Sequence, residues 1–321
     1  MHSFTCNICG AANTLEDVPW EPSTCADCGS NVRMRALIHL LSIELYGQAR
    51  PLTKFEKNKG IRGFGLSDAL LYAVPLAKLF DYTNTFYDRQ PYLDMTAPHP
   101  EQYGTYDFIL SSDVFEHVAP PVERAFQEAA KLLKPNGFMC ITVPSSGADE
   151  ATIEFYPDLH DYSIVQLGGE YVLINRKQDK TLEIHQNLEF HGGIGATLVM
   201  RQFSQRDLSC QLRGSGFSEV IYQTASVEPS GIILPGNWSL PLVARKDRYT
   251  LAPAQDAQQL DPEPEPETAL AAQEHAPPPA EDEKTVELQR RVVALESQLR
   301  IAANSRWLKL GQRLGFGPRL Q

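Results

Sequence analysis

An α/β fold with a mainly parallel central sheet is the fold class that the sequence predicts. Residues 105–146 read as strand, loop, helix, turn and strand, and residues 59–87 read as strand, glycine-containing turn, helix and strand. Strand–helix–strand units of this kind build parallel sheets with right-handed crossovers. Two later apolar segments, 216–223 and 238–246, are predicted to add further strands after a helix at 207–213.

The segment 105–146 has the most regular pattern. A short apolar run at 108–110 predicts one buried strand, and a second run at 138–143 predicts another. Between them, Pro120 and Pro121 open a helix, where the fixed backbone angle of proline costs little. Apolar residues then recur at helical spacing, namely Val122, Ala125, Phe126, Ala129 and Leu133. The run Pro135-Asn136-Gly137 stops the helix and leads into the second strand.

Polar side chains follow the first of these two strands. Ser112, Asp113, Glu116 and His117 come directly after the apolar run. In open α/β sheets, ligands bind at the carboxyl ends of the strands. We therefore expect these four residues to line a ligand-facing rim of the sheet.

A glycine-containing turn at 59–68 is expected at the same rim. Gly63 and Gly65 would let the backbone approach a ligand closely at a strand end, and Asp68 can cap the helix that follows. A lone Gly-x-Gly also fits an ordinary strand-to-helix turn. Its position before a helix and a second strand favours the ligand-binding interpretation.

Two further acidic residues are predicted at strand ends. The strand at 82–87 ends at Asp88, which lies 23 residues after Gly65. This spacing is near the roughly 20 residues expected for an acidic residue that reaches a ribose. A third short strand before residues 93–95 would place Asp94 on the same rim.

Four cysteines near the amino terminus form two Cys-x-x-Cys pairs separated by 15 residues, Cys6 with Cys9 and Cys25 with Cys28. Two such pairs are typical of a tetrahedral zinc site. Disulfides and a redox dithiol are the alternatives, and a reducing cytosolic setting disfavours the disulfides. Because four thiolates leave the metal no open position, Zn²⁺ bound here would be structural.

A helix at 30–46 is predicted after the cysteines, with one apolar stripe and Gly47 as its cap. Arg33 and Arg35 lie at its start. We interpret both as solvent-exposed surface arginines, with contact to an anionic substrate as the alternative.

The order of these features resembles a class I S-adenosylmethionine-dependent methyltransferase, of the kind found in bacterial surface-glycan gene clusters. The glycine turn, the acidic strand ends and the segment "YDFILSSDVFEHV…LLKPNGFMCITVP" carry the resemblance, which spans roughly residues 55–245. It implies a Rossmann-like, seven-stranded methyltransferase sheet with helices on both faces, and S-adenosyl-L-methionine as the cofactor.

The same resemblance implies roles for the rim residues. Gly63 and Gly65 would lie beside the methionine moiety, Asp88 at the ribose and Asp94 at the adenine amino group. Ser112 and Asp113 would lie beside the sulfonium. The family usually has an acidic residue two positions before the first glycine, where this chain has Ile61. Asp68 or Asp113 is the expected substitute for that carboxylate.

Methyl transfer to a hydroxyl needs an aligned nucleophile and a group that takes its proton. His160, in a loop or short helix predicted at 151–165, and His191, beside two glycines, are the leading candidates for this base. Asp161 or Asp158 can orient the His160 ring. His117 ranks last because it follows the strand loop, where a structural role is common.

The charge of the chain is unevenly distributed. The net charge is −11, and residues 1–250 hold 21 Lys and Arg against 29 acidic residues. This acidic balance disfavours a nucleic-acid partner, because phosphate binding needs basic groups. No apolar run approaches the roughly 20 residues needed to cross a bilayer, and the amino terminus shows no secretory signal pattern. We therefore expect a cytoplasmic protein.

The carboxyl-terminal segments differ in composition from the rest. Residues 251–283 contain seven prolines, nine acidic residues and no Lys or Arg, which predicts a disordered linker. Apolar residues then step by 4, 3, 4 and 3 from Leu288 to Ala302, as in a short coiled coil that could join copies of the chain. The basic, amphipathic end of 284–321 is predicted to contact a protein partner or the inner face of a membrane, with packing on its own domain as the alternative.

The predicted organisation and function follow from these points. The segments are a zinc ribbon (1–30), a connecting helix (31–54), the methyltransferase domain (55–250), an acidic linker (251–283) and a coiled-coil and basic tail (284–321). The first hypothesis is a methyltransferase acting on a hydroxyl of a saccharide or lipid-linked glycan. The alternatives are an RNA or protein methyltransferase, and a non-catalytic scaffold that binds partners through the ribbon and the tail.

Overall fold

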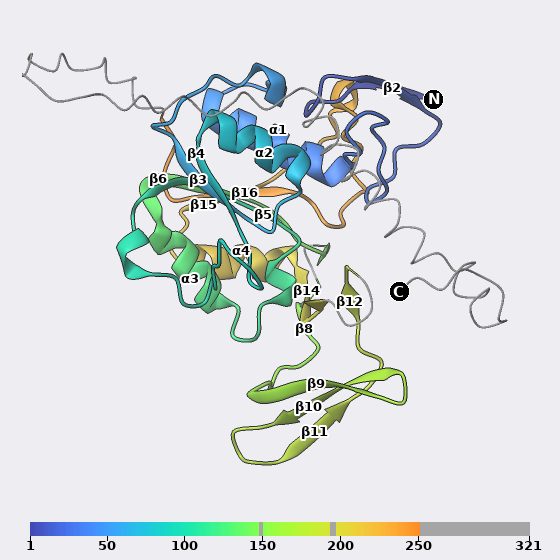
Figure 1. Ribbon diagram of the computed structural model, residues 1–321, viewed down its shortest axis with the longest axis vertical. Helices are drawn as coiled ribbons and strands as arrows, with labels where there is room; N and C mark the ends of the chain where they lie inside the picture. Colours follow the sequence, from blue (N-terminus) through green and yellow to red (C-terminus); the bar gives the residue numbers. More distant parts are fainter. Residues whose placement is uncertain (148–149, 193–196, 251–321) are drawn as a thin grey trace, which may run out of the picture. The chain divides into compact units, whose positions relative to one another are not determined.

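The computed structural model describes residues 1–147, 150–192 and 197–250, and it confirms an α/β fold with a mostly parallel central sheet. Six strands lie in the order β15-β16-β6-β5-β3-β4 (Figure 1). Strands β3 to β6 run parallel to one another, whereas β16 is antiparallel to both of its neighbours. The strand bounds are β3 (Arg62–Leu66), β4 (Asp81–Thr85), β5 (Tyr106–Ser112), β6 (Leu133–Thr142), β15 (Glu219–Tyr222) and β16 (Leu242–Arg245).

Within the described ranges this sheet has one strand fewer than the predicted seven. The segment before Asp94 forms only an isolated bridge between Phe86 and Tyr92. Pro91 lies inside it and has no N–H to donate to a strand ladder. Asp94 instead closes a turn, since one of its carboxylate oxygens accepts hydrogen bonds from the N–H and the hydroxyl of Thr96, both at 2.8 Å.

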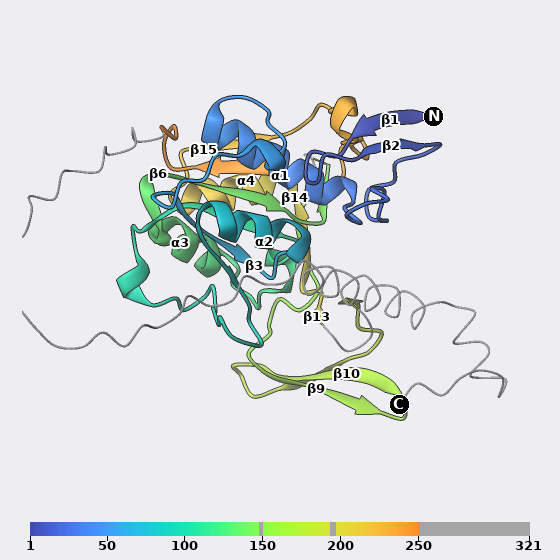
Figure 2. The ribbon, with the colours of Figure 1, turned by 45° about the horizontal axis from the view of Figure 1, so that its top comes forward.

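Helices cover both faces of the sheet (Figures 1 and 2). Helices α1 (Val32–Tyr46) and α2 (Leu70–Leu79) lie on one face, and α3 (Glu123–Leu132) and α4 (Gln205–Gly214) lie on the other. Side chains alternate between the two faces along β5, so that Phe108 and Leu110 join the first core while Ile109 joins the second. Short 3₁₀ turns are η1 (Leu52–Lys54), η2 (Pro100–Gln102), η3 (Phe115–His117) and η4 (Glu228–Ser230).

The predicted helix boundaries are mostly confirmed. The side chain of Asn31 accepts from the N–H of Met34 at the start of α1, and Gly47 ends the helix with a φ of 67°. Helix α3 ends at Leu132, but β6 begins at once rather than after the predicted turn at 135–137.

The amino-terminal segment shares a core with the sheet. Its hairpin, β1 (His2–Thr5) and β2 (Ala12–Leu15), packs with Trp20 and α1 in the same apolar cluster as Phe108. Arg35 is fully buried and donates to the Ser30 carbonyl, the Thr24 hydroxyl and the Gly231 carbonyl at 2.7–2.9 Å. The interpretation of Arg35 as a surface residue is therefore wrong, because its guanidinium joins this segment to the turn at η4.

Residues 145–204 depart most from prediction. The loop or short helix predicted at 151–165 is confirmed only in part. Residues 155–160 lie outside helices and strands, whereas the flanking residues form β8 (Ile153–Glu154) and β9 (Asp161–Leu167). Strand β9 pairs with β10 (Glu170–Arg176), which pairs with β11 (Leu182–His185), in a small antiparallel sheet. The remaining short strands are β7 (Ser145–Ser146), β12 (Phe190–His191), β13 (Thr197–Leu198) and β14 (Arg201–Ser204).

Among the described residues, none of the helices combines the length and apolar character needed to cross a membrane. The predicted acidic linker (251–283) and the predicted coiled-coil and basic tail (284–321) lie outside the described residues.

Candidate functional site

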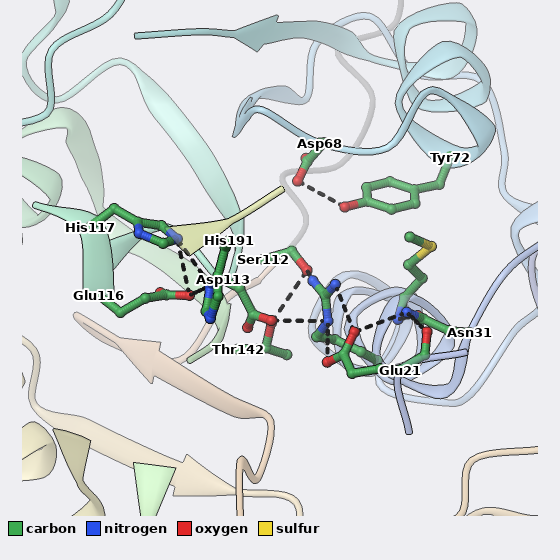
Figure 3. A network of polar contacts seen from close by, with 12 residues as sticks. Glu21, Asn31, Asp68, Tyr72, Ser112, Asp113, Glu116, His117, Thr142 and His191 are labelled. Carbon is green, nitrogen blue, oxygen red and sulfur yellow. Dashed lines mark hydrogen bonds and ion pairs between the residues drawn. The ribbon is translucent and has the colours of Figure 1, made fainter. Parts of the chain in front are cut away.

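The carboxyl ends of β3 and β5 mark the point where the strand order reverses. After β3 the chain adds β4 on one side, and it later returns to place β5 on the other side. Connections that leave in opposite directions open a crevice at such a switch point, where α/β proteins bind their ligands. Asp68, Ser112 and Asp113 lie at this rim, as the sequence predicted (Figure 3).

Asp68 is a buried carboxylate held by two tyrosines. Its side chain accepts hydrogen bonds from the hydroxyls of Tyr72, at 2.8 Å, and Tyr82. Burial raises the pKa of Asp68 to about 7, against the opposing effect of the two hydroxyls and of Arg33. The side chain of Asn84 in β4 bonds to both the N–H and the carbonyl of Asp68, which fixes the turn between β3 and α2.

Gly63 and Gly65 lie inside β3 rather than in a loop. A Cβ atom at Gly63 would overlap the ring of Phe108, and one at Gly65 would overlap the Asp68 carboxylate and the Tyr82 hydroxyl. The two glycines therefore make room for neighbouring side chains. A larger residue at position 65 would fill the space in which the Asp68 carboxylate meets the Tyr82 hydroxyl.

Arg33 brings a cation from the start of α1 to the rim. Its Nε lies 3.1 Å from the Asp113 carboxylate and 3.2 Å from that of Glu21, and Nη1 donates to the Ser112 hydroxyl. Only 15% of its side chain is exposed. The surface interpretation is wrong for Arg33 as well, because the packing of α1 on the sheet directs its side chain toward the ends of the strands.

Asp113 is fixed by the backbone as well as by Arg33. It adopts a φ of 52°, and its N–H donates to the Thr142 carbonyl at 2.9 Å. In contrast, Asp88 lies beyond the end of β4 with 72% of its side chain exposed and pairs with Arg89. Asp94 is half-buried in the turn described above.

Glu116, His117 and His191 form a cluster beside Asp113 (Figure 3). The Nδ1 atom of His191 lies 3.2 Å from Nε2 of His117 and 3.4 Å from Oε1 of Glu116. His117 Nε2 lies 3.6 Å from the same oxygen, and His117 Nδ1 lies 2.8 Å from the Leu198 carbonyl. The structure thus brings His191, a leading candidate for the base, into contact with His117, the candidate that was ranked last.

Burial dominates the electrostatics of this cluster. It raises the pKa of Glu116 and lowers the pKa of His117 to about 4, whereas the contact with Glu116 raises the pKa of His191. Glu116 is fully buried, while His191 keeps 38% of its side chain exposed and so can reach a bound molecule.

His160 and Asp161 lie at the small β9–β11 sheet instead. His160 is exposed, and its backbone N–H donates to the Asn175 side chain at 2.9 Å. Asp161 pairs with Arg176, and Asp158 pairs with Lys177 at 2.8 Å. Neither carboxylate hydrogen-bonds the His160 ring in the described part of the chain, so the expected orientation of that ring is not seen.

The four amino-terminal cysteines gather as the sequence predicted. The sulfurs of Cys6, Cys9, Cys25 and Cys28 lie within 4.8 Å of one another, with 3.8 Å between Cys6 and Cys28 and 3.6 Å between Cys9 and Cys25. These separations are far longer than a disulfide bond, and all four cysteines are free thiols.

A cavity of about 800 Å³ lies at the opposite, amino-terminal ends of the parallel strands. Its walls include Tyr46, Arg50, Ile61, Arg245 and Tyr249. The residues of the rim do not line it, so the cavity does not mark the candidate site.

Comparison with known proteins places the chain in a family. The family model described as a methyltransferase domain matches residues 54–220, more than half of the chain. The chain therefore belongs to the methyltransferase domain family, and S-adenosylmethionine-dependent methyl transfer is its general class of activity. No curated protein matches the sequence.

Solved structures with a similar fold share little sequence with the chain. One is 1,6-didemethyltoxoflavin-N1-methyltransferase of Burkholderia thailandensis, with 15% identity over 67% of this chain and 78% of that one, and a TM-score of 0.38. Another is the citrinin polyketide synthase methyltransferase domain, with 11% identity, 69% and 54% coverage, and a TM-score of 0.40. A third is an amino pentose methyltransferase of Micromonospora echinaspora, with 13% identity, 58% and 84% coverage, and a TM-score of 0.33. At these scores the likenesses leave the acceptor undefined.

Two contributors to the site were not predicted, the tyrosines that hold Asp68, and Arg33 was given a ligand contact only as the alternative. Tyr72 follows Asp68 by four residues, but Asp68 precedes α2, which begins at Leu70, so the helical spacing rule does not predict this contact. Tyr82 and Arg33 reach the rim through the pairing of β3 with β4 and the packing of α1, which no local pattern encodes.

Proposed function

We propose that the chain is an S-adenosylmethionine-dependent methyltransferase that methylates a hydroxyl of a saccharide or lipid-linked glycan. The observation that carries this proposal is the switch-point rim, where Asp68, Asp113 and Arg33 converge beside the Glu116–His117–His191 cluster. The glycan as acceptor rests only on the resemblance of the sequence.

The charged groups of the rim fit the cofactor. S-adenosylmethionine carries an ammonium, a carboxylate and a sulfonium, and it supplies an electrophilic methyl group when bound. Asp68 would hold the ammonium in place of the acid that the family usually has at the position of Ile61, which is buried and apolar here. Arg33 would hold the carboxylate, and Asp113, which pairs with Arg33, would lie beside the sulfonium as its negative neighbour.

His191 is the residue that we propose takes the acceptor's proton. Its ring is partly exposed, and Glu116 lies 3.4 Å from Nδ1, where a carboxylate favours the protonated imidazole. The positioned residues would mainly align the acceptor oxygen with the methyl carbon and the sulfur. His160 remains the alternative base, and its place in the small sheet gives it no contact with the rim residues in the described ranges.

We further propose that the four cysteines bind one structural Zn²⁺. Four thiolates leave no open coordination position, and the short distances between the sulfurs suit a single ion. Metal analysis of protein purified without chelator should give about one zinc that is lost on replacing Cys25 with Ser. An unchanged zinc content in that variant would refute the assignment.

Two experiments test the methyltransferase proposal. Calorimetry with S-adenosylmethionine should show binding, and Asp68→Ala should weaken it by at least about tenfold, the value of one charge-assisted hydrogen bond. Transfer of labelled methyl to sugar nucleotides, lipid-linked glycans and total RNA then identifies the acceptor class. No binding at millimolar cofactor would instead favour the non-catalytic scaffold, for which Ile61 is the motivating feature.

The tail proposal is separate from the catalytic one. Removing residues 284–321 should leave cofactor affinity intact but change the assembly size or the recovery of the protein with membranes. If neither property changes, the docking role of the tail fails.

A further inference from the structure

The buried carboxylate of Glu116 is the feature that methyl transfer alone leaves unexplained. Its side chain is 0% exposed, and neither oxygen has a hydrogen-bond partner among the residues that the structure describes. Buried polar groups are nearly always hydrogen-bonded, and an unpaired buried carboxylate is strongly unfavourable. Arg201, another buried residue of this region, binds Glu154 and the carbonyls of Phe115 and Val118 instead.

The neighbouring histidines do not satisfy Glu116 either. A carbonyl oxygen can only accept, so the 2.8 Å contact between His117 Nδ1 and the Leu198 carbonyl places the ring hydrogen on Nδ1. In the neutral ring, Nε2 then has a free lone pair, and it faces His191 and Glu116.

With Glu116 ionised, as a ligand of a cation must be, the cluster holds more acceptors than donors. The Nδ1 atom of His191 carries at most one hydrogen, which it can give either to His117 Nε2 at 3.2 Å or to Glu116 at 3.4 Å. One of these two acceptors stays unsatisfied in either case. A single cation at the centre of the three side chains would bind the lone pairs of His117 Nε2 and of the Glu116 carboxylate. It would also bind the lone pair of His191 Nδ1 when that atom carries no hydrogen.

We propose that Glu116, His117 and His191 bind a divalent transition-metal cation. Ligand atoms about 2.1 Å from one ion lie roughly 3.0–3.4 Å from each other in octahedral or tetrahedral geometry. The observed separations of 3.2, 3.4 and 3.6 Å are close to this range. The hydrogen bond from His117 to a backbone carbonyl is the support that metal-binding histidines usually have.

The donor set also indicates what the ion does. Two imidazoles and one carboxylate leave coordination positions open, as in catalytic zinc and non-haem iron sites. This role rests on the proposed methyl transfer. The ion would bind the acceptor hydroxyl and lower its pKa. With the ion bound, the proton would leave to solvent instead of to His191, whose Nδ1 lone pair the ion would occupy. The oxygen then forms the bond to the methyl carbon as the carbon–sulfur bond breaks, and the electron pair of that bond stays on sulfur.

Titration with Mn²⁺, followed by electron paramagnetic resonance, tests the site on the full chain. Mn²⁺ prefers carboxylate and imidazole ligands, so that the four cysteines compete little for it. Wild-type protein should bind one Mn²⁺ per chain at this site. Glu116→Gln and His191→Ala should each bind it at least about tenfold more weakly, because even an outer-shell partner is worth roughly 10- to 100-fold in metal affinity.

The exposed pair His99 and Glu101, 4.0 Å apart, provides matched controls. His99→Ala and Glu101→Gln should bind Mn²⁺ as the wild type does. Circular dichroism and cofactor calorimetry on the same samples separate loss of the site from loss of the fold. Absence of Mn²⁺ binding by the wild type, or equal affinity in wild type and Glu116→Gln, would overturn the metal site. Mn²⁺ binding without cofactor binding would refute the proposed function and leave the metal site standing.

Discussion

Asp68 and Glu116 are two buried carboxylates beside the same sheet rim, and their surroundings differ. Burial raises the pKa of both groups to about 7. Asp68 accepts hydrogen bonds from the hydroxyls of Tyr72 and Tyr82. The donor beside Glu116 is His191, whose Nδ1 lies 3.4 Å from the carboxylate and 3.2 Å from His117 Nε2. Asp68 thus has two donors of its own, whereas Glu116 shares one.

The hydrogen-bond donors around each of these carboxylates indicate what the carboxylate does. The tyrosines hold Asp68 in one orientation at the end of β3, which suits a group that binds a fixed cofactor atom. Glu116 shares its space with two imidazoles that cannot both satisfy it. Replacing each carboxylate by its amide should therefore affect different properties of the protein.

The largest effect is expected on turnover in Glu116→Gln. The amide keeps the shape of the side chain but cannot support the histidine pair or a cation, so methyl transfer should fall by about a hundredfold or more. Since the donor beside Glu116, His191, lies 3.4 Å away and can bond His117 instead, the free energy of unfolding without added metal should change by less than about 1 kcal/mol. Label transfer and urea unfolding measure the two quantities. A large loss of stability with normal turnover would reverse the proposed distinction.

Asp68→Asn, unlike Glu116→Gln, should lower the stability of the fold. Its amide nitrogen cannot accept, so one buried tyrosine hydroxyl loses its acceptor, and stability should fall by about 1–3 kcal/mol. Asp88→Asn is the matched control on an exposed acid and should change stability by less than about 0.5 kcal/mol. Equal urea midpoints for the two variants would show that the tyrosine contacts contribute nothing.

The pH dependence of stability provides a third distinction. The pKa of Asp68 is raised from 3.8 to about 7, so the folded protein holds a proton that the unfolded chain releases. This contribution is fully present below about pH 4 and is lost as the pH rises through about 7, with a slope of at most about 1.4 kcal/mol per pH unit. Asp68→Asn should lack this part of the slope in urea unfolding between pH 4 and 8. A slope equal to that of the wild type would contradict the raised pKa.

The sequence predicted those features that depend on residues close together in the chain. The strand ends at Ser112 and Asp113, the helix from 32 to 46 and the gathering of the cysteines follow from short-range patterns. The contact between His117 and His191 joins residues 74 positions apart through β12 and β13, so no spacing rule could predict it. The same holds for Arg33 and Ser112, which are 79 residues apart.

The strand at 161–167 was not predicted, although it contains Tyr162, Ile164 and Val165, residue types that favour strands. It pairs along its whole length with β10. The glycines expected in a turn at the rim lie inside β3 instead, and their contacts are with Phe108, Asp68 and Tyr82. A glycine pattern alone does not distinguish space for a ligand from space for a side chain.

Arg33→Lys tests the cationic side of the rim. A lysine keeps the charge but cannot contact Ser112, Asp113 and Glu21 together, as the guanidinium does. Cofactor affinity should fall by about fivefold, near 1 kcal/mol, in calorimetry. Arg50→Lys, in a surface pair with Glu56, is the control and should bind as the wild type does. Unchanged affinity in Arg33→Lys would remove Arg33 from the cofactor site.

The smallest effect is expected for His160→Ala, which separates the two histidines predicted as bases. His160 is exposed on the small sheet, and the bond that Asn175 receives comes from its backbone N–H, which alanine keeps. Turnover should therefore change by less than about twofold, as for an ordinary surface substitution. His191→Ala should lower turnover by about a hundredfold, because it removes the partly exposed member of the Glu116 cluster. If the two variants lose activity in the reverse order, the acceptor binds at the β9–β11 sheet and the rim cluster has only a structural role.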